Sequence, residues 1–158
     1  MHPIPTAALM GIEAKAVSVE ADISNGLPAF IVVGLPDAAV QEARERVRSA
    51  MKHSDLPFPY TKITINLAPA DLRKGGSGYD LPIAIAILSA MNYLQEPDQG
   101  WPLMVGELAL DGTVRAVQGA LSVAMSAQSS RNRTVIVPKV NANEAALVSG
   151  WLLYTHPS

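Results

Sequence analysis

A run of mainly apolar residues, Leu81 to Met91, most constrains how this chain can fold. It contains no charged residue, and Asp80 lies directly before it. A helix that spans a bilayer needs about 20 apolar residues, so this run is too short to cross a membrane. A helix that is apolar on nearly all sides is buried all round or packed between layers. The run therefore predicts a buried helix from Leu81 to about Tyr93.

The segments around this helix alternate between the period of a strand and the period of a helix. Strands are predicted over residues 14–22, 30–33, 62–67, 103–110, 113–117, 134–137 and 151–154, and further helices over 37–52, 119–128 and 141–148. The Asn25-Gly26 turn predicts that the first two strands form a hairpin. Asp37 and Asn141 are the expected N-caps. This order predicts an α/β or α+β class, a mixed sheet with helices packed on it.

Composition excludes several classes of protein. With 158 residues, one domain is the expected number. The chain is 49% hydrophobic with a net charge of −2, which excludes intrinsic disorder and disfavours a dedicated nucleic-acid-binding module. It has no Cys and only three scattered His, so neither a disulfide scaffold nor a zinc site is predicted. The N-terminus lacks the pattern of a signal peptide, and we expect a cytoplasmic protein with no membrane partner.

A glycine-rich loop precedes the buried helix, and it contains Gly75, Gly76 and Gly78 after Arg73 and Lys74. Such a loop can direct backbone N–H groups at an anion, or it can simply be a tight connection. The P-loop pattern is absent from the chain. Ser77 lies in this loop, but a serine nucleophile needs a neighbouring base. Lys74 is expected to be solvated and therefore to be no base.

Basic residues form a stripe on the helix predicted over 37–52. Arg44, Arg48 and Lys52 follow one another at intervals of four, and the spacing pairs Glu42 with Arg46. Such a stripe can contact phosphates, or it can be a solvated face with local glutamate pairs. Arg46, Lys62, Arg73 and Lys74 could lie nearby. No aromatic residue interleaves the stripe, so stacking on single strands is not predicted.

Several phrases in a fixed order identify a family resemblance. They are Gly11-Ile12-Glu13-Ala14, Gly26-Leu27-Pro28-Ala29-Phe30, the run from Val33 to Val40, the run from Arg44 to Ala50, the run from Ile65 to Lys74, Asp80-Leu81-Pro82-Ile83-Ala84, and the run from Gly106 to Gly112. Over residues 7–154 the chain resembles the N-terminal domain of the YifB/ComM proteins, which are also described as magnesium-chelatase-related or ChlI-like.

This resemblance implies a Lon-protease-like fold, a βαβ arrangement shared with a ribosomal protein domain. Full-length members continue into an AAA+ ATPase module, and the ComM branch is a hexameric DNA helicase that promotes branch migration. The resemblance therefore implies that residues 1–158 are one domain of a longer protein. Its expected partners are its own AAA+ module, neighbouring subunits of a hexamer and DNA. ATP and Mg are expected only in the ATPase module, and no cofactor is expected in this chain.

The Lon-like resemblance also implies where a Ser–Lys dyad would lie. Aligned on that pattern, Gly78 takes the position of the serine and Leu121 that of the lysine, with Ser77 one position early. No Lys occurs between Gly119 and Gln128. The resemblance therefore implies a domain without protease activity.

Three hypotheses follow. In the first, the chain is a non-catalytic domain that acts in hexamer assembly and DNA or partner contact, as a Lon-like domain does in the RadA-type repair helicase. Its expected contact residues are Arg44, Arg48, Lys52, Arg73 and Lys74, and Gly75, Gly76 and Gly78 would shape the loop. The second is a serine-peptidase relic with residual activity at Ser77. The third is a subunit of a genuine magnesium chelatase.

Overall fold

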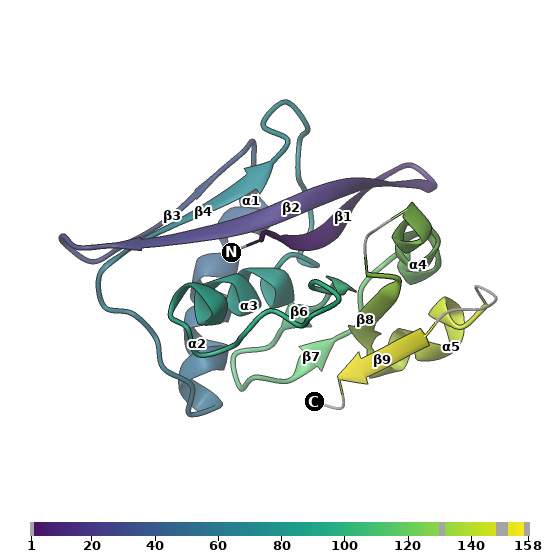
Figure 1. Cartoon of the computed structure of the whole chain (residues 1–158). Helices are drawn as coiled ribbons and strands as arrows, with labels where there is room; N and C mark the ends of the chain where they lie inside the picture. The colour runs from purple at the N-terminus through teal and green to yellow at the C-terminus, as the bar shows by residue number, and fades with distance from the viewer. Residues whose placement is uncertain (1, 130–131, 148–151, 157–158) are drawn as a thin grey trace.

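A four-stranded mixed sheet forms one layer of the molecule (Figure 1). The computed structural model describes residues 2–129, 132–147 and 152–156. The strands are β1 (Ile4–Met10), β2 (Glu13–Ser24), β3 (Ala29–Val33) and β4 (Lys62–Ala68), in the spatial order β1-β2-β4-β3. The α/β class with a mixed sheet is thus confirmed. β1 was not predicted, because its Pro5 and its small residues carry a weak strand pattern.

β2 is the long central strand of this sheet. Its first half pairs antiparallel with β1, from Met10 opposite Glu13 to Ile4 opposite Val19. Its second half pairs antiparallel with β4, and this ladder ends with Ser24 opposite Lys62. The two ladders overlap only near Val19, so the sheet is strongly staggered.

The predicted hairpin of the first two strands is wrong. β3 pairs with β4 in parallel, and β4 lies between β3 and β2. β4 alternates Ile63, Ile65 and Leu67 on the buried face, each at most 1% exposed. This position between two neighbours covers both backbone edges of β4. The Asn25-Gly26 sequence indicates only that the chain bends locally. The strand that pairs with β3 is β4, which is distant in the sequence.

The connection from β3 to β4 contains two helices, α1 (Ala38–Gln41) and α2 (Ala43–His53), where one was predicted. The break falls at Glu42, whose carbonyl accepts the N–H of Glu45 in a tight turn. The predicted N-cap is confirmed, because Asp37 Oδ1 accepts the N–H of Val40 at 2.9 Å. A parallel pair of strands with a helical crossover is a βαβ unit.

The predicted buried helix is α3 (Asp80–Ala90), and nearly all of its residues are buried. In Figure 1 it lies beside α2, on the same side of the four-stranded sheet. The main core fills the space between this sheet and the helices, with Val19, Val40, Val47, Ile65 and Ile83 at 0% exposure. The helix ends before Tyr93 because Asn92 adopts a left-handed conformation, with φ of 61°.

The second half of the chain builds a smaller layer. It contains β5 (Leu103–Met104), β6 (Glu107–Leu108), β7 (Val114–Arg115), α4 (Ala120–Ser126), a 3₁₀ turn η1 (Ala127–Ser129), β8 (Thr134–Pro138), a second 3₁₀ turn η2 (Lys139–Asn141), α5 (Ala142–Ala145) and β9 (Leu152–His156). β5, β8 and β9 form a parallel sheet, and β6 pairs with β7 as a hairpin. α4, α5 and this sheet enclose a second apolar core around Val123, Val135 and Val137.

Two details differ from expectation in this half. The predicted strand 103–110 is interrupted at Gly106, whose N–H bonds to Gly78 and whose carbonyl accepts the N–H of Leu81, both at 3.0 Å. Asn141 does not cap a helix with its side chain. Its amide instead bonds both to the N–H and to the carbonyl of Val117, at 2.9 and 3.0 Å. These tertiary bonds satisfy buried backbone groups that local sequence patterns do not reveal.

Candidate functional site

The glycine-rich loop between β4 and α3 is fastened to the loop that follows β3. The N–H of Lys74 bonds to the carbonyl of Leu35 at 3.0 Å, and the N–H of Asp37 bonds to the carbonyl of Lys74 at 2.9 Å. Gly75 lies so close to Asp37 that a Cβ would come within 2.7 Å of its Oδ2. A side chain at position 75 would therefore push on the Asp37 carboxylate, which caps α1.

Lys74 is buried, and the expectation that it is solvated is wrong. Its residue exposure is 0%, and its Nζ donates to the carbonyls of Gly34, at 2.7 Å, and of Pro69. Burial lowers the pKa of Lys74, and nearby Asp71 opposes this shift. The buried side chain thus connects the glycine-rich loop to the loop that follows β3. A sequence pattern could not show this, because a lysine between polar and glycine residues is usually exposed.

A cavity of about 500 Å³ lies beside this loop. It is lined by Ala7, Leu9, Gly75, Gly76, Ser77, Gly78, Tyr79, Val105, Ala116, Val117, Gln118 and Val123. The loop with Ser77 and Gly78 therefore lies across this cavity from the segment before α4. None of these lining residues is a Lys, His, Asp or Glu. Leu121 packs on the second core instead, and its N–H bonds to Glu144 Oε2 at 3.1 Å.

Tyr79 lines the same cavity and is only 3% exposed. Its hydroxyl has no hydrogen-bond partner within the part of the chain that the structure describes. Burial, with a smaller contribution from Asp37, raises the pKa of Tyr79 to about 12. The phenol is therefore neutral at physiological pH and does not supply a base to Ser77.

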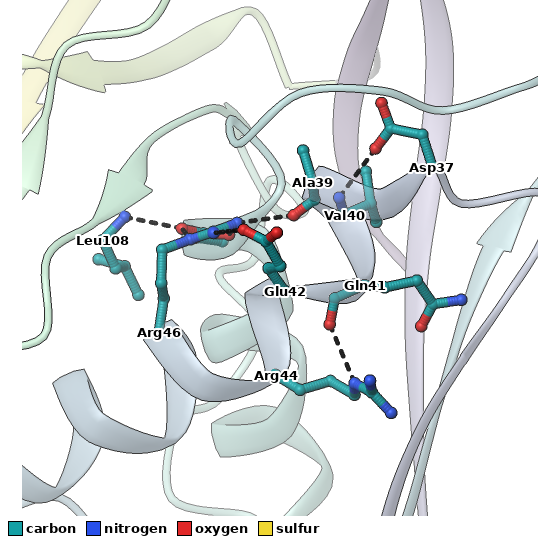
Figure 2. A network of polar contacts seen from close by, with 9 residues as sticks. Asp37, Ala39, Val40, Gln41, Glu42, Arg44, Arg46 and Leu108 are labelled. Atoms are coloured by element: carbon teal, nitrogen blue, oxygen red, sulfur yellow. Dashed lines mark hydrogen bonds and ion pairs between the residues drawn. The ribbon is translucent and has the colours of Figure 1, made fainter.

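Arg46 does not belong to the exposed basic stripe (Figure 2). Its Nε donates to Asp80 Oδ2 at 2.6 Å, and its Nη2 donates to Asp80 Oδ1 at 3.1 Å and to the carbonyl of Ala39 at 2.9 Å. The predicted contact with Glu42 is present but longer, at 3.6 Å. Asp80 also accepts the N–H of Leu108 at 3.0 Å. This network joins α2, α3 and β6.

The electrostatics of the network follow from burial. The hydrogen bond with Asp80 raises the pKa of Arg46. Burial raises the pKa of Asp80, while the bonds from Arg46 and Leu108 oppose that shift. The Asp80 carboxylate lies in the first turn of α3 and contacts other elements.

The remaining stripe residues lie along one side of α2, near the β3 edge. Arg44 donates to the carbonyls of Gln41, at 2.9 Å, and of Phe30, at 3.3 Å. Arg48 pairs with Glu45 at 3.1 Å, so the expectation of local glutamate pairs is confirmed. Lys52 is exposed near the end of the helix. The three predicted cations therefore share a surface, with local pairs on part of it.

Aromatic side chains lie beside this stripe in the folded chain, although none interleaves it in the sequence. The guanidinium of Arg48 is 5.8 Å from the ring centre of Phe58. Arg48, Lys52, Phe58 and Tyr60 line one small cavity. The aromatics come from the segment after the helix, and the fold, not the helical spacing, places them there.

The other predicted basic residues are on different elements. Arg73 is exposed at the start of the glycine-rich loop, and Lys62 is exposed at the start of β4. Among the described residues, no group of three or more His, Asp or Glu side chains is placed to hold a metal ion. None of the described helices is long and apolar enough to cross a membrane.

Comparisons with known proteins agree on one family. The model of the family described as subunit ChlI of Mg-chelatase matches residues 19–141. The chain is 50% identical over 147 residues to the uncharacterised protein YifB of Escherichia coli, and 48% identical over 142 residues to the competence protein ComM of Haemophilus influenzae. An uncharacterised protein of Mycobacterium bovis is 43% identical over 143 residues.

These alignments cover most of this chain and a smaller part of each relative. They include 93% of the chain for YifB, and 90% each for ComM and the mycobacterial protein. The chain spans 29% of the length of YifB, and 28% of the length of each of the other two.

Proposed function

Because this chain belongs to the family described as subunit ChlI of Mg-chelatase, we propose that it is a non-catalytic, Lon-like domain of a YifB/ComM-type AAA+ ATPase that assists ring assembly and contacts DNA. Its partners are then its own AAA+ module, neighbouring subunits and DNA. ATP and Mg bind in the AAA+ module and not in this domain.

The proposed contact with DNA is supported mainly by one surface of α2, on which Arg44, Arg48 and Lys52 lie together. Arg44 and Lys52 are exposed, and the side chain of Arg48 is 41% exposed. Cations on one helix face can neutralise successive phosphates, and this supplies sequence-independent affinity. Arg73 is a further exposed candidate on the glycine-rich loop. Lys74 is left out of this contact surface because it is fully buried.

Fluorescence anisotropy with labelled DNA tests this part at several salt concentrations. The double variant Arg48→Ala/Lys52→Ala should bind more weakly, and the slope of log affinity against log salt should fall by about two, because each removed cation leaves one phosphate without its partner. The matched control Lys15→Ala/Lys139→Ala removes the same charge from exposed positions on other elements. Unchanged affinity and slope in the stripe variant would remove DNA from the proposal.

The proposal that this domain is non-catalytic is supported by the cavity beside Ser77. A serine hydroxyl becomes a nucleophile only when a base accepts its proton. Neither Lys nor His is among the residues that line that cavity, and Tyr79 is held neutral. A peptidase relic would therefore lack its base.

The proposed role in ring assembly is supported by apolar side chains along the β3 edge. Leu27 is 88% exposed, Ile31 39%, Val33 41% and Leu35 53%. An exposed edge strand with apolar side chains is a ready site for contact with another chain. In the full-length parent, Ile31→Lys should lower the sedimentation coefficient of the assembled ring. Ile12→Lys, at a position that is 92% exposed elsewhere, is the control. Equal assembly of both variants would contradict this part.

The family description keeps a magnesium-chelatase subunit as the alternative function. Metal-insertion assays with the full-length protein and a porphyrin substrate separate the two. Magnesium insertion that depends on this protein would support the alternative and overturn the proposal.

A further inference from the structure

A second cavity, of about 240 Å³, opens between α2 and the segment that leads into β4. It is lined by Pro28, Ala29, Phe30, Arg48, Lys52, Phe58, Pro59, Tyr60, Thr61 and Ile63. Pockets for drug-sized ligands usually measure about 300–1,000 Å³, so this one suits a single planar ring system. It combines aromatic faces and two cations.

The aromatic residues of this cavity are held by prolines. Pro57 precedes Phe58, and Pro59 separates it from Tyr60. Proline fixes its own φ and restricts the residue before it, so this segment has few conformations to lose on binding. Phe58 packs on Phe30 with ring centres 6.1 Å apart, which anchors the segment to β3.

Tyr60 is the exposed member of this group. Its exposure is 74%, although a tyrosine ring is largely apolar. Phe58 is half-buried and supports the wall behind it. The cavity therefore offers one aromatic side chain at its surface, on a rigid backbone.

The cations lie on the α2 side of the cavity. The guanidinium of Arg48 lies 5.8 Å from the ring centre of Phe58, in the range of a cation–π contact. Lys52 follows one helical turn later and is exposed. A chain of phosphates that passes along α2 would meet these charges while its bases turn toward the aromatics.

We propose that this cavity binds one unpaired nucleobase of single-stranded DNA, stacked on Tyr60, with the flanking phosphates on Arg48 and Lys52. The inference rests on the proposed DNA contact and adds the form of the DNA and the residues that select it. Duplex DNA can meet the cations, but its bases are paired and stacked inside the helix. Stacking on aromatic side chains is the usual way in which proteins hold single strands.

Glu45 opposes this binding, because it pairs with Arg48 at 3.1 Å. A phosphate must compete with that carboxylate for the guanidinium. Glu45→Gln should therefore tighten the binding of single-stranded DNA. The control Glu13→Gln removes an exposed carboxylate that pairs with Lys15 on β2, and it should have less effect.

The main experiment measures the affinity of the chain for labelled 20-nucleotide oligothymidine and for a 20-base-pair duplex. Tyr60→Leu should weaken oligothymidine binding about fivefold or more and leave duplex binding unchanged. Tyr93→Leu is the control, since Tyr93 is also an exposed tyrosine, at 54%. Circular dichroism of each variant checks that the fold is kept.

Photo-crosslinking gives a readout that a merely structural role would not produce. Oligothymidine with one 5-iododeoxyuridine should crosslink to Tyr60 or Phe58, and peptide mass spectrometry locates the bond. If the chain binds both DNAs through the α2 cations but Tyr60→Leu changes nothing, the stacking site is overturned and the DNA contact stands. If the chain binds neither DNA, the DNA contact and this inference both fail.

Discussion

Arg46 and Asp80 lie 34 positions apart in the chain and meet in a two-pronged ion pair, with Nε–Oδ2 at 2.6 Å and Nη2–Oδ1 at 3.1 Å. The side chain of Asp80 is 1% exposed and that of Arg46 19%. The carboxylate receives a third bond from the N–H of Leu108. The pair therefore holds α2 and α3 together and attaches the β6–β7 hairpin to them.

Removal of Arg46 should strongly destabilise the fold. Arg46→Ala leaves the Asp80 carboxylate buried with only the Leu108 N–H as partner, and loss of one member of a buried pair costs about 3–5 kcal/mol. Urea unfolding followed by circular dichroism measures this loss. Arg44→Ala is the control, since Arg44 is exposed and bonds only to backbone carbonyls; its loss should be about 1 kcal/mol or less. Equal losses in the two variants would contradict a structural role for the pair.

Tyr79→Phe should leave the protein as stable or more stable at neutral pH. The change deletes a buried hydroxyl that has no partner among the described residues, and an unsatisfied group of this kind costs about 1–3 kcal/mol. A loss above about 1 kcal/mol in urea unfolding would show that the hydroxyl has a favourable partner.

The same tyrosine should make stability fall at alkaline pH. The folded state keeps the phenolic proton up to a pKa of about 12, whereas the unfolded chain releases it near the ordinary value of 10.0. The unfolded state therefore binds fewer protons between these values, and the free energy of unfolding falls as the pH rises through them. Unfolding free energies measured at about pH 9 and about pH 11, on either side of the ordinary pKa, should show a smaller decrease in Tyr79→Phe than in the parent chain. An identical decrease would argue against the raised pKa.

Gly34→Ala should be among the most damaging small substitutions. Gly34 has φ of +108°, and a Cβ there would overlap the carbonyl oxygen of Leu67. Backbone strain and overlap each cost about 1–3 kcal/mol. Gly76→Ala is the matched control, because its φ is +88° but nothing lies within 4 Å of the added Cβ. Thermal unfolding should show the larger drop for Gly34→Ala, and a larger drop for Gly76→Ala would refute the steric argument.

Ser77 should not react with a serine-directed fluorophosphonate. Ser77 lines a cavity whose lining contains neither Lys nor His, so no base there activates its hydroxyl. Intact-mass spectrometry after incubation should show an unchanged chain, with trypsin as the positive control for the reagent. Modification at Ser77 that a Ser77→Ala variant abolishes would revive the peptidase hypothesis.

The sequence predicted best what local patterns control. The apolar run from Leu81 indicated the position and the burial of α3, because a helix without a polar face has only one kind of place in a globular fold. Asp37 was identified as an N-cap, since its side chain acts on the N–H three residues later. The alternation in 62–67 indicated β4 for the same local reason.

What the sequence could not predict depends on contacts between distant residues. Lys74 looked like a surface lysine, but its side chain bonds to the carbonyl of Gly34, which is 40 positions away in another loop, as well as to that of Pro69 in its own loop. Phe58 and Tyr60 follow α2 in the chain, so helical spacing could not place them beside Arg48. The spacing indicated only the contact of Arg46 with Glu42, and the stronger pair of Arg46 with Asp80 joins residues 34 positions apart. In each case the local pattern indicated solvent or a near neighbour as the partner of a side chain. The fold instead supplies a partner that is distant in the sequence.

The two ladders of β2 differ in how far apart the paired residues lie in the sequence. The first half of β2 closes on β1 across the short turn at Gly11 and Ile12, which is a local contact that forms with little loss of chain entropy. The second half pairs with β4, whose Lys62 lies opposite Ser24 far along the chain. β3 joins this sheet only through β4. We therefore expect the β1–β2 hairpin to form early and the β3 edge to open first, which native-state hydrogen exchange of the strand amides would measure.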